Sequence, residues 1–436
     1  MQTVYTFPLK QHIGAPSVPV VQAGDHVERG QRIAAIPEGK LGANLHTSVR
    51  GTVEQVTDTA IAIRADEKQP DTFMPISGEG VLELVREAGI VGMGGAGFPA
   101  HVKLATKLPP QGVVIANCAE CEPILGHNIS RLEKNPTQLV HGLRYAMQAT
   151  GAGRGIVAIK AKHVEAIRSL KNVIDPKTME IHLLEDLYPM GEERAIVREC
   201  LGVLLGVDQL PSAANAVVSN AETLCRVAEA VEQKKPSITK DVTVAGRLKG
   251  RAIQTFLDVP TGTSVETLLE KAGGPAAEYG ELIMGGPFTG RRTTLESPIT
   301  KTSGGVIAAM PFLHETRPLG LLVCACGADE ARLRELAASM GAPVVAVERC
   351  KQADLLPSGA LKCENPGCCP GQAERVLRLK KAGAQAVLIS NCTDCTNTVM
   401  TVAPKLGLPV YHCTDGALRA VNFPLVRRMK LNRKTS

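Results

Sequence analysis

Gly92-Met93-Gly94-Gly95-Ala96-Gly97-Phe98-Pro99 is the most informative segment of this sequence. It places four glycines within six residues, and glycine has no side chain to bury and costs backbone entropy on folding. Such a run suits a place where the backbone approaches a flat or anionic ligand closely and turns bare amides toward it. A glycine run alone is weak evidence, because such runs recur on unrelated folds.

Three further polar blocks follow the glycine run along the chain. Val113-Val114-Ile115-Ala116 reads as a short buried strand, and the first block begins where this strand ends. In open α/β sheets, ligands bind just beyond the carboxyl ends of the strands, so this position favours a binding site. The blocks are Asn117-Cys118-Ala119-Glu120-Cys121-Glu122-Pro123, Tyr188-Pro189-Met190-Gly191-Glu192-Glu193 and Asn220-Ala221-Glu222-Thr223.

The glycine run and the three blocks, in this order, resemble the flavin site shared by the NADH-oxidising 51 kDa subunit of respiratory complex I and the RnfC subunit of RNF electron-transport complexes. The resemblance covers roughly residues 1–310. Within that family, the sequence is most similar to the proline reductase-associated electron transfer proteins of amino-acid-fermenting bacteria. The resemblance implies an electron-transfer oxidoreductase that uses FMN and NADH.

The resemblance also implies which residues bind the cofactors. The glycine run and a following lysine would hold the FMN phosphate and ribityl chain, and the 117–123 block would contact the isoalloxazine and ribityl region. The 188–193 block would form the opposite wall, where the family's acidic pair also meets the nicotinamide nucleotide. The 220–223 block would close the phosphate end, and an aromatic would stack on the adenine. By number, the implied binding residues are Gly92, Gly94, Gly95, Gly97, Phe98, Lys103, Asn117, Glu120, Tyr188, Gly191, Glu192, Glu193, Asn220 and Thr223.

Three positions depart from the family pattern. Complex I subunits have an arginine where Met93 stands, an aspartate where Ala119 stands and a second stacking aromatic where Thr106 stands. These replacements affect NADH binding more than FMN binding. The sequence also lacks the two ferredoxin-like CxxCxxCxxxCP motifs of RNF-type subunits, so electrons must leave the flavin by another route.

The composition is that of an ordinary globular protein. The chain has 436 residues, of which 44% are hydrophobic and 21% charged, and its net charge is +6. A basic run over 427–434 has no interleaved aromatics, which does not favour nucleic-acid binding. The sequence contains no apolar run of about 18 residues that would predict a membrane span, and no secretory signal. We therefore expect a cytoplasmic protein whose 13 cysteines are reduced.

Hydrophobic periodicity predicts a multidomain α/β protein. Alternating strands and turns over 1–75 resemble a lipoyl-like barrel sandwich, without the lysine that carrier domains modify. Strand and helix patterns alternate over 76–237, the expected FMN/NADH-binding domain. A β unit over 238–310 resembles the soluble-ligand-binding β-grasp (SLBB) module. After a linker, a βαβ pattern over 319–436 predicts a cysteine-rich redox domain with a small parallel sheet.

Two local predictions concern these last two domains. Thr263 and Glu266 have the spacing of a capping box for a helix over 264–271. The C-terminal pattern predicts a helix over 396–405, between the strands of the parallel sheet.

Nine of the 13 cysteines fall in the C-terminal domain. Cys392 and Cys395 form a CxxC pair that follows a predicted strand and opens a predicted helix, a setting that lowers a thiol pKa. One interpretation is a dithiol relay in which this pair is catalytic. The other is an iron–sulfur or zinc site, because thiolates hold both metals. Its candidate ligands are Cys324, Cys326, Cys363, Cys368 and Cys369.

The remaining cysteines receive separate interpretations. Cys118 and Cys121 form a second CxxC inside the flavin block, for which we expect packing against the flavin, with a flavin-adjacent disulfide as the alternative. Cys200, Cys225 and Cys350 are expected to be small buried apolar groups. The C-terminal layout also resembles the cysteine- or selenocysteine-bearing domains of glycine and proline reductase components, which favours redox-active thiols.

Together these inferences predict a protein that oxidises NADH via FMN and passes electrons through C-terminal thiols, or a metal cluster, to a partner reductase. The resemblance implies an amino-acid reductase as that partner, most plausibly D-proline reductase. Two alternatives stay open. The chain could be a non-catalytic adaptor that kept the fold but lost the flavin, or a metal- or cofactor-binding scaffold with the cysteines as its main site.

Overall fold

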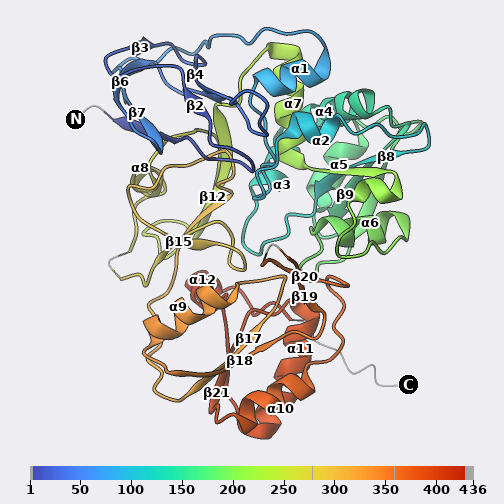
Figure 1. Ribbon diagram of the computed structural model, residues 1–436, viewed down its shortest axis with the longest axis vertical. Coiled ribbons are helices and arrows are strands. Elements are labelled where there is room, and N and C mark those ends of the chain that lie inside the picture. The colour runs from blue at the N-terminus through green and yellow to red at the C-terminus, as the bar shows by residue number, and fades with distance from the viewer. Residues whose placement is uncertain (1–2, 277, 358, 428–436) are drawn as a thin grey trace.

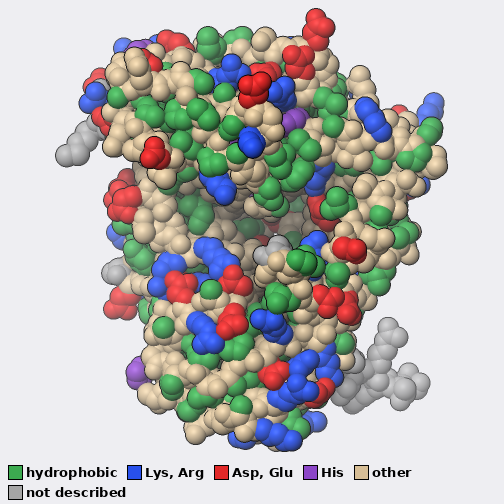
Figure 2. Space-filling model, in the orientation of Figure 1, with side chains coloured by type: hydrophobic (Ala, Val, Ile, Leu, Met, Phe, Trp, Pro, Cys, Tyr) green, Lys and Arg blue, Asp and Glu red, His purple; other side chains and the backbone are tan. Residues whose placement is uncertain are grey.

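The computed structural model describes residues 3–276, 278–357 and 359–427. Four sheet-containing units follow one another along the chain, from blue at the N-terminus to red at the C-terminus in Figure 1. The first three units form the upper body of the view, and the C-terminal unit lies below them. Figure 2 shows a hollow between these two parts on the same face. No helix in the described ranges is long and apolar enough to cross a membrane.

The N-terminal unit consists of two small sheets around one apolar core. Their strand orders are β1-β7-β6-β3 and β2-β4-β5. Burial alternates along β7, where Ile61 and Ile63 are fully buried and Arg64 is exposed, as expected for a strand with one face on the core. The strands are β1 (Val4–Pro8), β2 (Val18–Pro19), β3 (His26–Val27), β4 (Arg32–Ala35), β5 (Leu45–His46), β6 (Gly51–Val56) and β7 (Ala60–Ala65).

The second unit holds a four-stranded parallel sheet with the order β10-β9-β8-β11. Apolar cores fill both faces, with Val114 in one core and Ile115 in the other, which explains the continuous apolar run of this strand. The strands are β8 (Val113–Cys118), β9 (Arg154–Lys160), β10 (Met179–Leu184) and β11 (Ala216–Asn220). The helices are α1 (Gly80–Glu87), α2 (Ala100–Leu104), α3 (His127–Lys134), α4 (Pro136–Thr150), α5 (Val164–Lys171), α6 (Glu193–Leu201) and α7 (Ala221–Gln233).

The third unit is a five-stranded mixed sheet with the order β13-β12-β16-β14-β15. Its assignment to the SLBB class stays a prediction. The sheet is accompanied by one helix, α8 (Val265–Lys271), whose side chains Leu268 and Leu269 enter the same core. The strands are β12 (Thr239–Gly246), β13 (Ile253–Pro260), β14 (Leu282–Met284), β15 (Arg291–Thr293) and β16 (Gly305–Ala308).

The start of α8 differs from the predicted capping box. Ser264 is the N-cap, and its hydroxyl accepts a hydrogen bond from the Thr267 N–H at 3.1 Å. Thr263 still belongs to the turn after β13, where its hydroxyl donates to the Pro260 carbonyl at 2.7 Å. The prediction that paired Thr263 with Glu266 is therefore wrong by one residue.

The C-terminal unit is a second parallel sheet, with the order β18-β17-β21-β22. A two-stranded hairpin, β19 (Ala353–Leu355) with β20 (Leu361–Cys363), projects from it and was not predicted. The other strands are β17 (Leu319–Val323), β18 (Val344–Arg349), β21 (Ala386–Ile389) and β22 (Val410–His412). The helices are α9 (Glu330–Met340), α10 (Ala373–Lys381), α11 (Thr393–Val402) and α12 (Asp415–Ala420).

The helix predicted over 396–405 lies earlier than expected. Helix α11 begins directly after Cys392, which is its N-cap residue, and ends at Val402. Pro404 lies in the 3₁₀ turn that follows, because a proline ring clashes with the α-helical backbone that precedes it. The CxxC pair therefore occupies the first turn of the helix.

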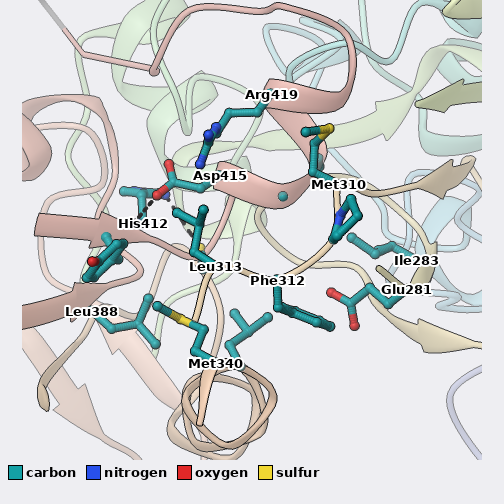
Figure 3. A pocket seen from close by; sticks show the side chains of 16 residues that line it. Glu281, Ile283, Met310, Phe312, Leu313, Met340, Leu388, His412, Asp415 and Arg419 are labelled. Atoms are coloured by element: carbon teal, nitrogen blue, oxygen red, sulfur yellow. Dashed lines mark hydrogen bonds between the residues drawn. The ribbon is translucent and has the colours of Figure 1, made fainter. Parts of the chain in front are cut away.

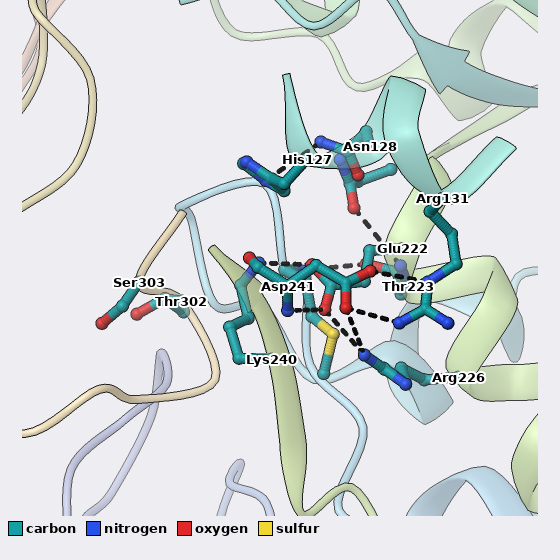
Figure 4. Close-up of polar contacts among 12 residues, drawn as sticks. His127, Asn128, Arg131, Glu222, Thr223, Arg226, Lys240, Asp241, Thr302 and Ser303 are labelled. Carbon is teal, nitrogen blue, oxygen red and sulfur yellow. Dashed lines mark hydrogen bonds and ion pairs between the residues drawn. The ribbon is translucent and has the colours of Figure 1, made fainter. Parts of the chain in front are cut away.

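A buried ionic network joins the second unit to the third (Figure 4). Arg226 of α7, which is 1% exposed, donates to Glu222, Glu229, Asp241 and Asp258. A buried guanidinium requires such partners, since an unpaired buried charge is very costly. The network fixes β12 and β13 against α7 of the second unit. We call the second unit the flavin-type domain, and its parallel sheet the flavin-type sheet, after the resemblance of its sequence.

Candidate functional site

The glycine run forms a tight loop whose tip is open to solvent. The Gly92 N–H donates to the carbonyl of half-buried Phe98 at 2.8 Å, and the Gly97 N–H donates to the Gly92 carbonyl at 3.0 Å. Residues 94–96 at the tip are exposed. Gly95 has a φ of +112°, and a Cβ there would meet nothing within 4 Å. The tip thus leaves backbone and space available to a ligand.

Met93 points away from the tip and into the core. Its side chain is 1% exposed, and its backbone N–H donates to the Thr223 hydroxyl at 2.9 Å. This bond holds the loop against the first turn of α7. A side chain packed inward cannot reach a nucleotide, so the arginine of complex I subunits has no equivalent here.

One lysine ammonium group, paired with a glutamate, lies near the glycine loop. Lys103 Nζ lies 2.5 Å from Glu193 Oε1 and 3.1 Å from the Val218 carbonyl, at the carboxyl end of β11. Asn220, two residues further, caps the N-terminus of α7, and a Cβ on Gly94 would lie 3.3 Å from it. The lysine, the helix N-terminus and the loop tip therefore meet in one place, which is the usual composition of a phosphate site.

Asn117 and Glu120 follow β8 at the same sheet edge. The Asn117 side-chain amide donates to the Gly191 carbonyl at 2.9 Å, which joins two of the sequence blocks. Glu120 has a φ of +40°, and its carboxylate accepts from the Asn128 N–H at 2.8 Å and the Asn128 side chain at 3.2 Å. A non-glycine residue held at positive φ is characteristic of functional turns.

The carboxylates of the adjacent residues Glu192 and Glu193 have different partners. The Glu192 carboxylate caps α6 by accepting from the N–H groups of Arg194 at 2.8 Å and Ala195 at 2.9 Å. Glu193, in contrast, is directed to Lys103. Only Glu193 therefore belongs with the residues around the glycine loop.

Tyr188 faces the C-terminal unit. Its ring is stacked on Phe288, with centroids 3.7 Å apart, and its hydroxyl donates to the Cys326 carbonyl. The Tyr188 N–H donates to the Thr393 hydroxyl at 2.9 Å, and the Thr393 N–H donates back to the Tyr188 carbonyl at 3.1 Å. The 188–193 block is thus in direct contact with two cysteine-bearing segments.

Helix α6 extends this contact. Arg194, which is buried, donates to the Cys363 carbonyl at 2.5 Å. Arg198 donates to the Pro366 carbonyl at 2.8 Å and to the Asn365 side chain. The loop after the β19–β20 hairpin is therefore held on the flavin-type domain by charged donors.

A cavity of about 670 Å³ opens at the carboxyl edge of the flavin-type sheet. This volume lies in the range of cofactor and substrate sites. Residues that line it include Glu120, Cys121, Lys160, His163, Tyr188 and Thr393. The cavity thus borders both the flavin blocks and the first turn of α11.

The glycine-loop side of this edge fits FMN. The loop tip is open, a cation is at hand in Lys103, and the N-terminus of the 13-residue helix α7 adjoins it. A dianionic phosphate needs this combination of amide donors, lysine charge and helix dipole.

Three cysteines meet at the carboxyl edge of the C-terminal sheet. Cys324 follows β17, Cys350 follows β18, and Cys395 lies in the first turn of α11, after β21. All three are buried, and their sulfur atoms lie within 4.8 Å of one another. The adjacent order β18-β17-β21 explains why strand ends distant in sequence converge.

Further cysteines surround these three. Cys392 contacts Cys324 and Cys395, and Cys369 contacts Cys395. Cys326 contacts Cys324, and Cys363 contacts Cys326. The cysteine cluster, as we use the term, consists of Cys324, Cys326, Cys350, Cys363, Cys369, Cys392 and Cys395.

The structure of the cluster corrects two of the sequence predictions and shows that two predicted sites are one site. Cys350, expected to be only a buried apolar group, is one of the three central thiols. Cys368, expected to be a metal ligand, is exposed and lies outside the cluster, whereas its neighbour Cys369 contacts Cys395. The CxxC pair and the proposed metal ligands occupy the same place. Cys350 follows the apolar run over 344–347 after two intervening residues, and this nearness to a strand-like segment is the signal that could have identified it.

Contacts between the thiols separate their pKa values. The contact with Cys326 holds the pKa of Cys324 well below its usual range, and the contact with Cys324 does the same for Cys392. The contact with Cys324 raises the pKa of Cys395. The contact between Cys395 and Cys369 lowers the pKa of Cys369 to about 6. Contacts within the cluster therefore lower the pKa of some thiols and raise that of others.

The second CxxC pair does not form a disulfide. Cys118 and Cys121 are both free thiols, and Cys118 is buried in the core of the flavin-type domain. Cys121 packs instead against the core of the C-terminal unit, and its sulfur accepts from the Gly191 N–H at 3.2 Å. Burial raises the pKa of Cys121 to about 12, so it is an uncharged thiol.

A second cavity lies between the five-stranded sheet and the C-terminal unit (Figure 3). Its volume is only about 50 Å³, far below the size of a cofactor site. His412, which borders it, already interacts with the Asn391 carbonyl at 2.8 Å and the Thr414 hydroxyl at 2.8 Å. This cavity is therefore a packing gap.

Comparisons with known proteins match these features. The family model of the Nuo51 FMN-binding domain matches residues 85–229, and that of the RnfC barrel sandwich hybrid domain matches residues 1–71. The cobalamin reductase PduS of Salmonella typhimurium is 33% identical over 339 residues, which cover 77% of this chain and 70% of that protein. The RnfC-type subunit of the proton-translocating ferredoxin:NAD(+) oxidoreductase complex of Clostridium ljungdahlii is 33% identical over 321 residues, which cover 69% of each chain.

Proposed function

This chain belongs to the family of the RnfC subunits and the complex I 51 kDa flavoprotein, and we propose that it is an NADH-oxidising electron-transfer protein with FMN as its bound cofactor. Electrons leave through the cysteine cluster to a partner protein. A cytoplasmic location, in which the free thiols stay reduced, is part of the proposal.

The residues at the glycine loop have separate tasks in this proposal. Lys103 supplies the positive charge for the phosphate, and Glu193, 2.5 Å from its ammonium group, holds that group in place. Asn117 keeps Gly191 close by its hydrogen bond to the carbonyl, which holds the third block against the first. When bound, FMN supplies hydride acceptance and release of single electrons. The full proposed binding set is Gly92, Gly94, Gly95, Gly97, Phe98, Lys103, Asn117, Glu120, Tyr188, Gly191, Glu193, Asn220 and Thr223. Glu192 is left out of this set because its carboxylate caps α6.

The contact of Tyr188 with the cysteine-bearing segments is the observation that carries the proposal. Tyr188 belongs to the block that resembles a flavin wall, and it is bonded to Cys326 and to Thr393, the residue after Cys392. A route from the flavin-type sheet to the cluster thus runs through packed protein rather than solvent.

The electron count constrains the partner. Oxidation of one NADH to NAD⁺ releases two electrons and one proton. The partner, or two copies of a one-electron partner, must therefore accept two electrons for each NADH consumed. A dithiol route would accept them together, with one cysteine disulfide reduced per NADH, whereas a metal route would pass them singly.

Two acceptors are candidates. D-proline reductase follows from the resemblance to proline reductase-associated proteins. A cobalamin is favoured by a separate observation, the 33% identity to a cobalamin reductase over 77% of this chain. Parallel assays that measure how fast the purified protein reduces each acceptor with NADH distinguish the two candidates.

Flavin binding and NADH oxidation test the core of the proposal. Purified protein, reconstituted with FMN, is expected to be yellow, to bind about one FMN per chain and to be bleached by NADH under anaerobic conditions. NADPH serves as the comparison nucleotide. A protein that takes up no FMN, or whose FMN is not reduced by NADH, would show the proposal to be wrong.

A further inference from the structure

We propose that Cys369 and Cys395 are a redox-active dithiol pair, and that Cys369 is the thiol that attacks a disulfide of the partner protein. The sequence interpretation paired Cys395 with Cys392 instead. The proposal deepens the proposed function and rests on it for the source of the electrons, which is the oxidation of NADH. The choice of the two sulfurs rests on their contacts and their exposure.

Exposure distinguishes Cys369 from the other thiols around Cys395. Cys395 contacts Cys324, Cys350, Cys369 and Cys392. Cys369 is half-buried, whereas the other three are buried. Cys392 and Cys395 are only 2% and 3% exposed, so the CxxC pair presents no sulfur that a partner protein can reach. An exchanging pair needs one accessible sulfur and one that resolves the mixed disulfide, and Cys369 with Cys395 meets both needs.

Two polar side chains hold Cys369 and Cys395 side by side. The side-chain nitrogen of Gln372, which is fully buried, lies 3.9 Å from the Cys369 sulfur and 3.6 Å from the Cys395 sulfur. The Thr398 hydroxyl lies 3.3 Å from the Cys369 sulfur and donates to the Cys395 carbonyl at 2.9 Å. The contact between the two cysteines is therefore supported from two different helices and is not a chance approach of one loop.

The surroundings of the Cys369 sulfur suit a nucleophile. The Gly371 N–H donates to this sulfur at 3.3 Å, in addition to the longer bond from Gln372. Hydrogen bonds from N–H groups stabilise negative charge on sulfur, and the thiolate is the form that attacks a disulfide. A Cβ on Gly371 would meet nothing within 4 Å, so there is open space beside the loop at this point.

The loop that carries Cys369 allows the pair to close. Both cysteines are free thiols in the structure, and a disulfide requires their sulfurs to approach to about 2.05 Å. Cys369 lies between β20 and α10, outside regular structure, whereas Cys395 is fixed in the first turn of α11. A small shift of the loop is therefore sufficient, because loops move more readily than the elements that they connect.

Cys395 connects the pair to the flavin-type domain. It lies two residues after Thr393, which exchanges two hydrogen bonds with Tyr188. The buried member of the pair is thus close to the junction between the two domains, and the half-buried member is the one that a partner can reach.

The exchange proceeds through a mixed disulfide. The Cys369 thiolate attacks one sulfur of the partner disulfide, and the other partner sulfur leaves as a thiolate. Cys395 then loses its proton to solvent and attacks the Cys369 sulfur, which forms the Cys369–Cys395 disulfide and releases the second partner thiolate. The partner gains two electrons and, from solvent, two protons. The two electrons released by one NADH return the Cys369–Cys395 disulfide to two thiols.

The test measures exchange between the full-length, reduced protein and a small disulfide, dithiobis-nitrobenzoate. The parent for all variants is Cys368→Ser, which removes the exposed neighbouring thiol. Its fast phase is expected to release about two equivalents of thionitrobenzoate per chain and to leave a Cys369–Cys395 disulfide, identified by mass spectrometry of peptides. A Cys392–Cys395 disulfide in its place, or no disulfide, would overturn the proposal.

Further substitutions in this parent separate the roles of the two thiols. Cys395→Ser should release about one equivalent and leave thionitrobenzoate attached to Cys369, because the resolving thiol is gone. Cys369→Ser should abolish the fast phase. Cys200→Ser, which removes a half-buried thiol of α6, is the matched control and should leave the fast phase unchanged. A fast phase that survives Cys369→Ser would contradict the assignment.

Two measurements keep the outcome interpretable. Circular dichroism establishes that each variant is folded, and if Cys395→Ser is not, the peptides of the parent still identify the disulfide. The exchange needs neither NADH nor FMN, so its failure is distinct from a failure of the proposed function. Reduction of the Cys369–Cys395 disulfide by NADH in the FMN-loaded protein then tests the link between the two, and failure of this last step alone would contradict the proposed electron source.

Discussion

Tyr188 and Thr393 are joined by two backbone-anchored hydrogen bonds that run in opposite directions. One residue belongs to a block that resembles a flavin wall, and the other lies between the two cysteines of the C-terminal CxxC. The tyrosine hydroxyl adds a third bond, to the Cys326 carbonyl. The two ends of the proposed electron route are therefore fixed to each other by three hydrogen bonds, each of which uses at least one main-chain group.

Tyr188→Phe should loosen this junction. The substitution keeps the ring on Phe288 but leaves the Cys326 carbonyl without its donor, which should lower the free energy of unfolding by about 1–3 kcal/mol. Urea unfolding measures the effect. Tyr145→Phe is the control, because that hydroxyl bonds to Glu232 at an exposed site and its loss should cost less than about 0.5 kcal/mol. Equal effects of the two changes would contradict a buried junction.

Lys103→Met should weaken FMN binding and leave riboflavin binding unchanged. The lysine would contact only the phosphate, and a charge-assisted bond contributes about 1.5–3 kcal/mol, equivalent to a roughly 10- to 150-fold rise in the FMN dissociation constant. Flavin fluorescence titration measures both ligands. Lys107→Met is the control, since that ammonium group donates to the Ala149 carbonyl instead. An equal loss for both flavins would place the lysine at the ring rather than at the phosphate.

Thiol labelling should distinguish Cys368 from the cysteine cluster. Cys368 is exposed, whereas Cys324, Cys350 and Cys395 are buried, so a brief native-state reaction with iodoacetamide should modify Cys368 well before these three. Mass spectrometry of peptides gives the order of modification. Unfolding in urea before labelling should make all four equally reactive. Rapid native labelling of Cys350 would contradict its buried position.

Arg226→Met should be severely destabilising. The guanidinium is the shared partner of four carboxylates, and its removal leaves buried negative charge uncompensated, at an expected cost of about 3–5 kcal/mol. Chemical denaturation measures the change. Arg168→Met removes an exposed ion pair on α5 and should cost less than about 0.5 kcal/mol. A small effect at Arg226 would mean that the two domains are held together by other contacts.

The same network predicts a loss of stability in acid. Burial raises the pKa of Asp241, Glu229 and Asp258, but Arg226, the neighbouring cations and hydrogen bonds together outweigh burial, so the pKa of each carboxyl lies below its ordinary value. A lowered folded-state pKa gives stability that is complete above the unfolded-state values, about 4, and is lost as pH falls below them. Urea unfolding between pH 7 and pH 3 tests this window. Arg226→Met should flatten the profile, and a wild-type profile that is already flat would contradict the prediction.

Much of the architecture could be predicted because it depends on local patterns. Val113–Ala116 is apolar throughout, as a strand covered on both faces must be, and the strand–helix alternation after Leu319 predicts a parallel sheet. The sequence does not predict the β19–β20 hairpin, since its strands are only three residues long and so short an alternation of apolar and polar residues is no signal. The start of α8 was misplaced because Thr263 and Ser264 are both good caps and only the turn after β13 decides between them.

The candidate site likewise contains features that sequence patterns predict and features that they do not. The glycine loop, Lys103 and Asn220 were recognisable as a set because their order along the chain is itself a signal. Cys350 belongs to the cysteine cluster because of the order of the strands in the sheet, and Cys368 lies outside it because of the direction of its loop. The spacing of the cysteines along the sequence encodes neither of these. Glu192 illustrates a third case, because its use as a helix cap competes with ligand binding and is settled only by the backbone around it.

The central thiols have a consequence for how the protein matures in the cell. They come from the ends of three strands, and the strand that precedes Cys395 is inserted between β17 and β22. A nascent chain emerging from the ribosome exposes Cys324 and Cys350 before their companions exist. The cysteine cluster can therefore be complete only after α11 has been synthesised, and a chain shortened before Cys392 would lack Cys392 and Cys395 while its flavin half could still be complete.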